Sequence, residues 1–218
     1  MAILTIQPSN IDTYLYEGGK GTNFGLLTYV EVRIYNDGEE VKTSRPILKF
    51  DFSALPANAT ITAATLNLYF YAHTIYDAAG RTYWAYELTQ TEWVEAEATW
   101  NSYKTGSTWA AAGGDYTTTN GASVTVPNHP NWTTWDVLAL VQHFQSTHAN
   151  VAHFLIKDNS ETGGAQYDAE FYSREYIVNT TLCPKLIITY TPPDAAVWLR
   201  RITINRDKSP RIWKRKEI

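Results

Sequence analysis

The sequence predicts an all-β protein, a jelly-roll β-sandwich with one short helix and a C-terminal extension. Apolar and polar residues alternate over many short segments, which is the period of half-buried strands. Aromatic residues make up 14% of the chain and charged residues only 18%, and a composition rich in Tyr, Trp and Thr favours sheets. With 218 residues, the chain is long enough to bury a core of its own.

The clearest pair of strands lies within residues 45–71. Apolar and polar residues alternate over 48–52 and again over 64–70. The connection from Ser53 to Thr60 is too long for a two-residue hairpin, so the chain is expected to cross here between two packed sheets. We expect this pair to supply much of the core through five buried side chains: Phe50, Phe52, Leu66, Leu68 and Phe70.

The other elements can be placed in chain order by the same patterns. Strands are expected at 2–7, 30–35, 83–88, 124–126, 154–156, 170–175 and 186–190, which with the central pair gives about ten. Turn-rich composition predicts loops at 17–25, 105–121 and 158–164. One helix is expected to begin at Asp136 as its N-cap, because apolar residues recur after it at helical spacing: Val137, Leu138, Leu140, Val141 and Phe144.

The charge divides the chain into two parts. Residues 194–218 contain eight basic and three acidic side chains, a net charge of +5, so the total of −4 leaves −9 for residues 1–193. We predict a sandwich over 1–193 and a basic assembly arm over 194–218, which adds a strand to another copy or meets an acidic capsid surface. The arm residues would be Trp198, Leu199, Arg200, Arg201, Ile202, Ile204 and Trp213.

Several classes of protein are disfavoured by what the sequence contains. Its single cysteine, Cys183, cannot form an intramolecular disulfide. The first residues resemble no secretory signal, which favours assembly inside a cell, and no apolar run reaches the ~18 residues of a membrane span. An acidic body with a basic tail is unlike a nucleic-acid-binding domain. We therefore predict neither nucleic acid nor membrane as a partner.

No catalytic centre is expected. Three glutamates lie close to Trp93 and Trp100 in the sequence: Glu92, Glu95 and Glu97. Paired carboxylates can act as the acid and the nucleophile of a glycoside hydrolase. The simpler interpretation is a loop anchored by two buried tryptophans, with solvated glutamates that titrate near their ordinary pKa values. No nucleophile or phosphate-binding motif occurs. We predict a protein that is not an enzyme.

No cofactor or metal site is predicted from the five histidines. His143 and His148 are five residues apart, which misses the i, i+4 spacing of a helical metal site, so surface or loop positions are expected. A structural calcium ion is the one open alternative. It would be held by Asp168, Glu170 or Asp158 with loop carbonyls, although no EF-hand spacing supports it.

Sugar binding would need exposed aromatic rings with polar neighbours, because the C–H faces of sugars stack on rings while the hydroxyl groups form hydrogen bonds. The candidates are Trp109 and Tyr116 in the long loop, Trp132 before the helix, and Tyr103. The acidic body repels anionic polymers, so a neutral glycan is expected.

Several segments occur in a characteristic order: FDFSALPANATITAATLNLYFY, TEWVEAEATWN, WDVLALVQHF, and FYSREY followed by PKLIITYTP. Together they resemble the DNRLRE or disaggregatase-related family, which is similar to certain carbohydrate-binding modules. The resemblance covers nearly all of residues 10–191. It implies a jelly roll without an active site, used as a surface-adhesion appendage or, in short stand-alone versions, as a virion protein of tailed phages.

Arg174 and Glu175 stand where that family carries its Arg-Glu pair. Expected within a strand, they would point to opposite faces, one paired internally and the other at the surface. We assign both a structural role, because an unpaired buried arginine is costly.

These observations lead to one main functional prediction and one alternative. The main prediction is a structural component of a phage-like virion, in capsid decoration or the tail, whose partners are its own copies and capsid proteins, with contact to cell-surface glycans. The alternative is a carbohydrate-binding or adhesion module of a larger secreted protein, located outside the cell or at its surface.

Overall fold

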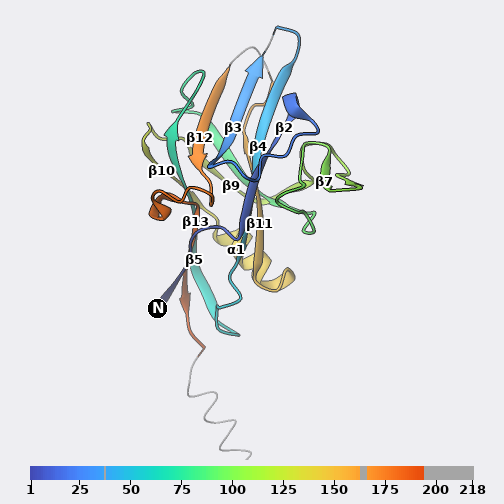
Figure 1. Ribbon diagram of the computed structural model, residues 1–218. Helices are drawn as coiled ribbons and strands as arrows, with labels where there is room; N and C mark the ends of the chain where they lie inside the picture. The colour runs from blue at the N-terminus through green and yellow to red at the C-terminus, as the bar shows by residue number, and fades with distance from the viewer. Residues whose placement is uncertain (37, 163–165, 194–218) are drawn as a thin grey trace, which may run out of the picture.

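A computed structural model describes residues 1–36, 38–162 and 166–193 (Figure 1). The assembly arm predicted for 194–218 lies outside these described residues. One α-helix, α1 (Leu138–Thr147), and two short 3-10 turns, η1 (Glu17–Gly19) and η2 (Thr180–Leu182), accompany the strands. The strands are β1 (Ala2–Ile6), β2 (Ile11–Tyr16), β3 (Tyr29–Asn36), β4 (Val41–Asp51), β5 (Thr60–Ala72), β6 (Thr82–Leu88), β7 (Ser102–Lys104), β8 (Ser107–Thr108), β9 (Tyr116–Thr125), β10 (Asn131–Asp136), β11 (Val151–Asp158), β12 (Tyr167–Tyr172) and β13 (Lys185–Thr191).

Eleven strands form one curled antiparallel sheet. The hydrogen-bonded order is β1-β13-β5-β12-β3-β4-β11-β6-β9, with β10 added to β5 and β2 added to β4. The two short strands β7 and β8 pair separately. The long strand β5 is shared, because its N-terminal part pairs with β13 and its C-terminal end with β12. The sheet therefore folds over itself into the predicted jelly-roll sandwich.

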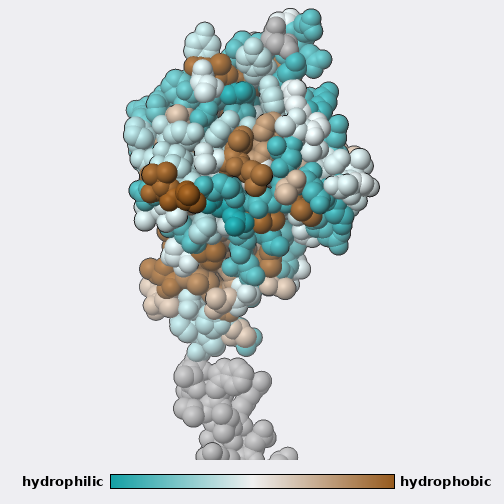
Figure 2. Space-filling view, in the orientation of Figure 1, coloured by the Kyte–Doolittle hydropathy of each residue, from teal (hydrophilic) through white to brown (hydrophobic). Residues whose placement is uncertain are grey.

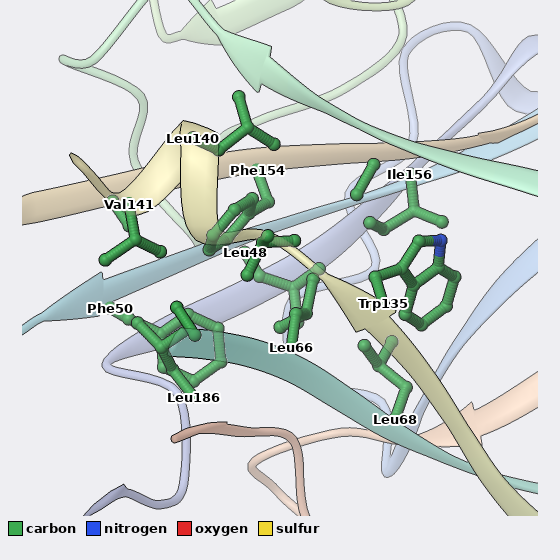
Figure 3. Packing of buried hydrophobic residues seen from close by; sticks show 14 of the residues in the cluster. Leu48, Phe50, Leu66, Leu68, Trp135, Leu140, Val141, Phe154, Ile156 and Leu186 are labelled. Atoms are coloured by element: carbon green, nitrogen blue, oxygen red, sulfur yellow. The ribbon is translucent and has the colours of Figure 1, made fainter. Parts of the chain in front are cut away.

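The main core lies between the layers (Figure 3). Side chains of β5 and β10 meet those of β4, β11 and α1 there, and the labelled residues include Leu66, Trp135 and Phe154. The five core residues that the sequence predicts, Phe50, Phe52, Leu66, Leu68 and Phe70, are all 0% exposed, which confirms the central pair. Burying each such side chain contributes about 1.5–3 kcal/mol.

A second apolar cluster forms where residues 89–115 cover part of the outer face of the sheet. Trp93, Trp100 and Trp109 are buried here, packed with Leu88 and Leu155 of β6 and β11. The Nε1–H group of Trp109 donates to the Thr99 carbonyl at 2.8 Å. The loop is thus anchored by buried tryptophans, as predicted.

Some boundaries differ from the predictions. The helix begins at Leu138, while Asp136 ends β10 and accepts a hydrogen bond from the Leu138 N–H at 3.2 Å. Residues 116–125, expected mostly as a loop, form β9, because the edge of β6 gives this Thr-rich segment a pairing partner. No helix of the described residues is long and apolar enough to cross a membrane.

Candidate functional site

Three aromatic side chains form a strip on the outer face of the sheet, which we call the β6–β9 strip: Trp84, Tyr86 and Tyr116. The rings of Trp84 and Tyr86 lie 5.5 Å apart with an interplanar angle of 8°. Those of Tyr86 and Tyr116 lie 5.4 Å apart at 18°. Trp84 and Tyr86 face outward because the alternate residues Tyr83 and Ala85 are buried in the core.

Gly121 allows the ring of Tyr86 to lie against β9. A Cβ atom at Gly121 would come within 2.4 Å of Tyr86 Cε1 and 2.6 Å of its Cδ1, so any larger residue would displace the ring. Tyr86 is still only half-buried, and so are Trp84 and Tyr116. The indole N–H of Trp84 donates to Asn159 Oδ1 at 3.0 Å, which fixes the first ring of the strip.

The Tyr116 end of the strip is charged. Arg45 makes two hydrogen bonds of 2.8 Å to the Glu161 carboxylate, and the Lys157 ammonium lies 2.8 Å from the same group. Both cations lie over Tyr116, at 5.7 Å and 5.8 Å from the ring centroid. Burial, followed by the nearby Tyr116 and Glu161, raises the pKa of Tyr86. Two cations sharing one carboxylate leave this end locally positive.

A second aromatic group, the β5–β12 strip, lies elsewhere on the sheet and consists of Tyr69, Tyr71, Trp132, Tyr172 and Tyr176. Its ring faces largely cover one another. Tyr172 stacks on Tyr71 at 4.1 Å and on Tyr176 at 3.6 Å, and the Lys185 ammonium lies 3.8 Å from the Trp132 centroid. The strip ends beside an exposed apolar patch on the loop joining β12 to β13 (Figure 2), where Ile177 is 84% exposed.

The predicted sugar-contacting residues do not come together. Trp109 is only 4% exposed, so the expectation that it offers a ring to a sugar is wrong, because the second cluster encloses it. Tyr103 is half-buried and packs on Trp109. Tyr116 lies in β9 within the β6–β9 strip, and Trp132 lies in β10 within the β5–β12 strip. The sequence predicted a strand at 83–88, which contains Trp84 and Tyr86, but these two residues were not among the candidate sugar contacts.

The three glutamates of the loop have different surroundings and not all keep ordinary pKa values. Glu92 pairs with Lys104 and is largely exposed. Hydrogen bonds from Thr105 lower the pKa of Glu97. Burial raises the pKa of Glu95, whose Oε1 accepts from the Asp12 N–H at 2.8 Å. The expectation of ordinary titration is therefore wrong for Glu95 and Glu97.

Arg174 and Glu175 lie in a turn after β12, not in a strand, so the argument from opposite faces does not apply. The turn lets one guanidinium contact both Glu95 and Glu175 at 3.4 Å. Arg174 also donates to the Asn10 carbonyl, and its backbone N–H donates to Asp12 Oδ2 at 3.0 Å. The pair thus joins three segments that are distant in the sequence.

The residues named for calcium are divided between two places. Asp158 is held by Arg81, with contacts of 2.5 Å and 2.7 Å. Asp168 and Glu170 instead join Glu31 in a buried group, where Asp168 Oδ1 accepts from the Ile75 N–H and Oδ2 from the Thr74 N–H. Calcium binding remains a prediction.

The histidines were expected at the surface or in loops, and this expectation is wrong for His153. His153 is 3% exposed and its Nδ1 accepts a hydrogen bond from the Trp93 indole N–H at 3.1 Å. Burial, then the neighbouring Lys49 and His148, lowers the pKa of His153 to about 4. This burial could not be predicted from the sequence, because Trp93, which covers His153, is distant along the chain.

Most of the chain matches a family of known proteins. A family model for carbohydrate-binding module family 96 matches residues 4–190. A search of curated proteins finds no match. The expected similarity to carbohydrate-binding modules is therefore confirmed, although the match is not to the DNRLRE family. With nearly the whole described fold covered, the chain belongs to carbohydrate-binding module family 96.

Proposed function

We propose that this module binds an extended glycan chain along the β6–β9 strip. The observation that carries the proposal is the arrangement of Trp84, Tyr86 and Tyr116, whose nearly parallel rings recur every 5.4–5.5 Å. This spacing is on the scale of one sugar ring in an extended chain. Each half-buried ring can therefore contact a successive sugar.

Stacking on such rings is favourable because the C–H faces of a pyranose are apolar while its rim is polar. Polar groups lie at both ends of the strip, with Asn159 beside Trp84 and the Arg45, Lys157 and Glu161 group beside Tyr116. These donors and acceptors are suited to the hydroxyl groups of a sugar. A row of half-buried rings on the outer face of two paired strands suits the side of a long chain better than its end.

The β5–β12 strip is the less suitable surface. Tyr172 has one ring on each face, at 4.1 Å and 3.6 Å, which is closer than the 5.4–5.5 Å between rings of the β6–β9 strip. The Lys185 ammonium lies 3.8 Å from the Trp132 centroid, whereas the two cations over Tyr116 lie 5.7 Å and 5.8 Å from its centroid. A sugar would have to displace the closer contacts of the β5–β12 strip. This strip supplies matched control variants, because its aromatic residues are also half-buried on the sheet.

The charge of the ligand is a separate part of the proposal. The net charge of −9 for residues 1–193 predicts a neutral glycan, whereas the Tyr116 end of the strip carries two cations against one carboxylate. We keep the neutral glycan as the prediction and include uronic and sulfated polymers in its test.

Glycan binding favours a location at a cell surface or outside the cell, and supports the alternative of a binding module over the predicted virion component. The virion role, the contacts with capsid proteins and self-assembly remain predictions that neither the fold nor the family match supports. We propose a binding role without catalysis, since the glutamates considered for hydrolysis are held by Lys104, Asp12 and Thr105.

The test is a screen of soluble neutral, uronic and sulfated polysaccharides by affinity electrophoresis, comparing the wild type with Trp84→Ala and with Trp132→Ala. Stronger retardation by the uronic or sulfated polymers than by any neutral one would contradict the neutral ligand. We expect retardation of the wild type and of Trp132→Ala by at least one neutral polymer, and reduced retardation of Trp84→Ala. Equal loss in both variants, or loss only in Trp132→Ala, would place the binding surface elsewhere.

A further inference from the structure

Two histidines and one glutamate converge where the end of α1 meets β6. His143 lies in the last turns of α1, His148 is its C-cap residue and Glu87 belongs to β6. The two imidazole Nε2 atoms face different oxygens of the same carboxylate, with 3.3 Å from His143 to Oε2 and 3.5 Å from His148 to Oε1. The Glu87 side chain is 8% exposed, whereas those of His143 and His148 are 34% and 23% exposed. The group is thus open to solvent on its histidine side.

Thr147 determines which nitrogen of His148 carries a hydrogen. The Thr147 hydroxyl donates its only hydrogen to the His143 carbonyl at 2.7 Å. It also lies 2.6 Å from His148 Nδ1, where it can only accept. Nδ1 is therefore the protonated nitrogen, and in neutral His148 the Nε2 atom presents a lone pair to the Glu87 carboxylate. Two electron-rich groups facing each other require a positive species between them, either a proton or a metal ion.

The distances favour a metal ion over a proton. A charge-assisted N–H···O bond is about 2.7–2.9 Å long, shorter than both contacts here. Two ligands of a tetrahedral zinc ion, each about 2.0–2.1 Å from the metal, lie about 3.3–3.4 Å apart. The separations of 3.3 Å and 3.5 Å are close to this second geometry, with each histidine facing a different oxygen of the same carboxylate.

The surroundings fit the same assignment. One donor atom from each of Glu87, His143 and His148 lies within 4.8 Å of the others. The C-terminal end of a helix carries partial negative charge, which favours a cation. Metal-bound histidines usually donate their other ring N–H group to a neighbour, as His148 does to Thr147.

We propose that Glu87, His143 and His148 form a binding site for a divalent transition metal of the zinc class. Imidazole nitrogen is a ligand that such ions prefer, in contrast to calcium or magnesium. Three protein ligands leave the fourth position of a tetrahedral ion to water on the exposed side. The ion would fix the C-terminal end of α1 to β6, immediately after Tyr86 of the β6–β9 strip.

The test uses the full chain, freed of metal with a chelator and titrated with zinc chloride by calorimetry at neutral pH. We expect His148→Ala and Glu87→Gln each to bind one equivalent of zinc fewer than the wild type. Thr147→Val keeps all three ligands but removes the hydroxyl group that contacts His148 Nδ1. This variant should therefore bind the equivalent about 10-fold more weakly. His73→Ala is the matched control, since it removes a half-exposed histidine that belongs to a different group, and it should retain the equivalent.

Cobalt substitution gives a second readout, which reports the coordination geometry of the bound ion. The wild type loaded with Co²⁺ should show the intense visible absorption of a tetrahedral site, and His148→Ala should lose it. No zinc binding by the wild type, an octahedral cobalt spectrum, or an unchanged number of sites in His148→Ala and Glu87→Gln would overturn the proposal. The first of these results would leave a protonated histidine as the partner of Glu87.

Discussion

The ring of Tyr86 lies so close to the backbone of Gly121 that a Cβ atom there would be 2.4 Å from Tyr86 Cε1. This contact connects the two strands of the β6–β9 strip and holds the central ring down on the sheet. It also explains why a glycine occurs inside β9, where it would otherwise weaken a strand. The proposed binding surface therefore depends on a residue that need not touch the ligand.

Replacing Gly121 with alanine should weaken glycan binding without unfolding the protein. The new methyl group would push the Tyr86 ring away from β9 and remove part of its stacking with a sugar, a loss of about 0.5–1.5 kcal/mol. Gly21→Ala is the control, because a Cβ atom at Gly21 meets no heavy atom within 4 Å. Calorimetry on both variants checks this. Equal affinities of Gly121→Ala and the wild type would show that the position of the ring is unimportant.

The core is tested by Phe50→Ala. Phe50 is 0% exposed and its ring meets Phe154 edge-on at 6.2 Å, so truncation leaves a cavity and should cost about 3–5 kcal/mol of unfolding free energy. Ile3→Ala, at a residue that is 69% exposed, should change stability by no more than about 0.5 kcal/mol. Urea denaturation measures both. A midpoint that does not change in Phe50→Ala would contradict the packing described for β4 and β11.

A pH-dependent stability is expected from Asp12. Burial, then the nearby Glu175 and Glu95, raises its pKa from 3.8 to about 7. Between these values the unfolded chain has lost the proton that the folded protein keeps, so this group's contribution to stability falls as the pH rises through that window. Asn carries no such proton. The stability of Asp12→Asn relative to the wild type should therefore increase from pH ~4 to pH ~8, on the order of 4 kcal/mol.

Denaturation of both proteins across this pH range provides the measurement. The contribution of Glu31, which is not among the groups that shift Asp12, is common to the two proteins and cancels in the difference, whereas Glu95 and Glu175 are coupled to Asp12 and change with it. A difference that stays constant with pH would mean that Asp12 titrates in the folded state as it does in the unfolded chain.

Arg174 should contribute to stability and not to binding. Arg174→Ala leaves the Asn10 carbonyl without this donor and Glu95 and Glu175 without their shared cation, a loss of about 1–3 kcal/mol. Lys104→Ala breaks a more exposed ion pair with Glu92 and should leave the denaturation midpoint unchanged. Reduced glycan affinity in Arg174→Ala at full folding would contradict the structural role.

Much of the fold could be predicted because its signals are local. The alternation over 48–52 and 64–70 and the helical spacing after Asp136 each follow from one short segment. The extent of β9 could not be predicted, because a Thr-rich segment becomes a strand only when β6 offers it an edge. Likewise the Arg174 turn is fixed by Asp12 and Glu95, both distant along the chain.

The candidate site was less predictable for the same reason. Tyr116 could be recognised as a polar aromatic residue, but its alignment with Trp84 and Tyr86 depends on the pairing of β6 with β9. Trp109 was expected to be accessible because it lies in a turn-rich segment. It is instead buried in the second apolar cluster, whose members come from distant parts of the chain. Composition identifies such rings, whereas tertiary packing determines which of them remain accessible.

The proposal that the β6–β9 strip binds a glycan is tested most directly by calorimetry of the double variant Trp84→Ala/Tyr86→Ala with the polysaccharide that retards the wild type. Removing two rings should cost about 1–3 kcal/mol, a roughly ten- to hundredfold loss of affinity. The double variant Tyr69→Ala/Trp132→Ala, which changes the β5–β12 strip, should bind like the wild type. Wild-type affinity in Trp84→Ala/Tyr86→Ala, with loss in Tyr69→Ala/Trp132→Ala, would contradict the assignment.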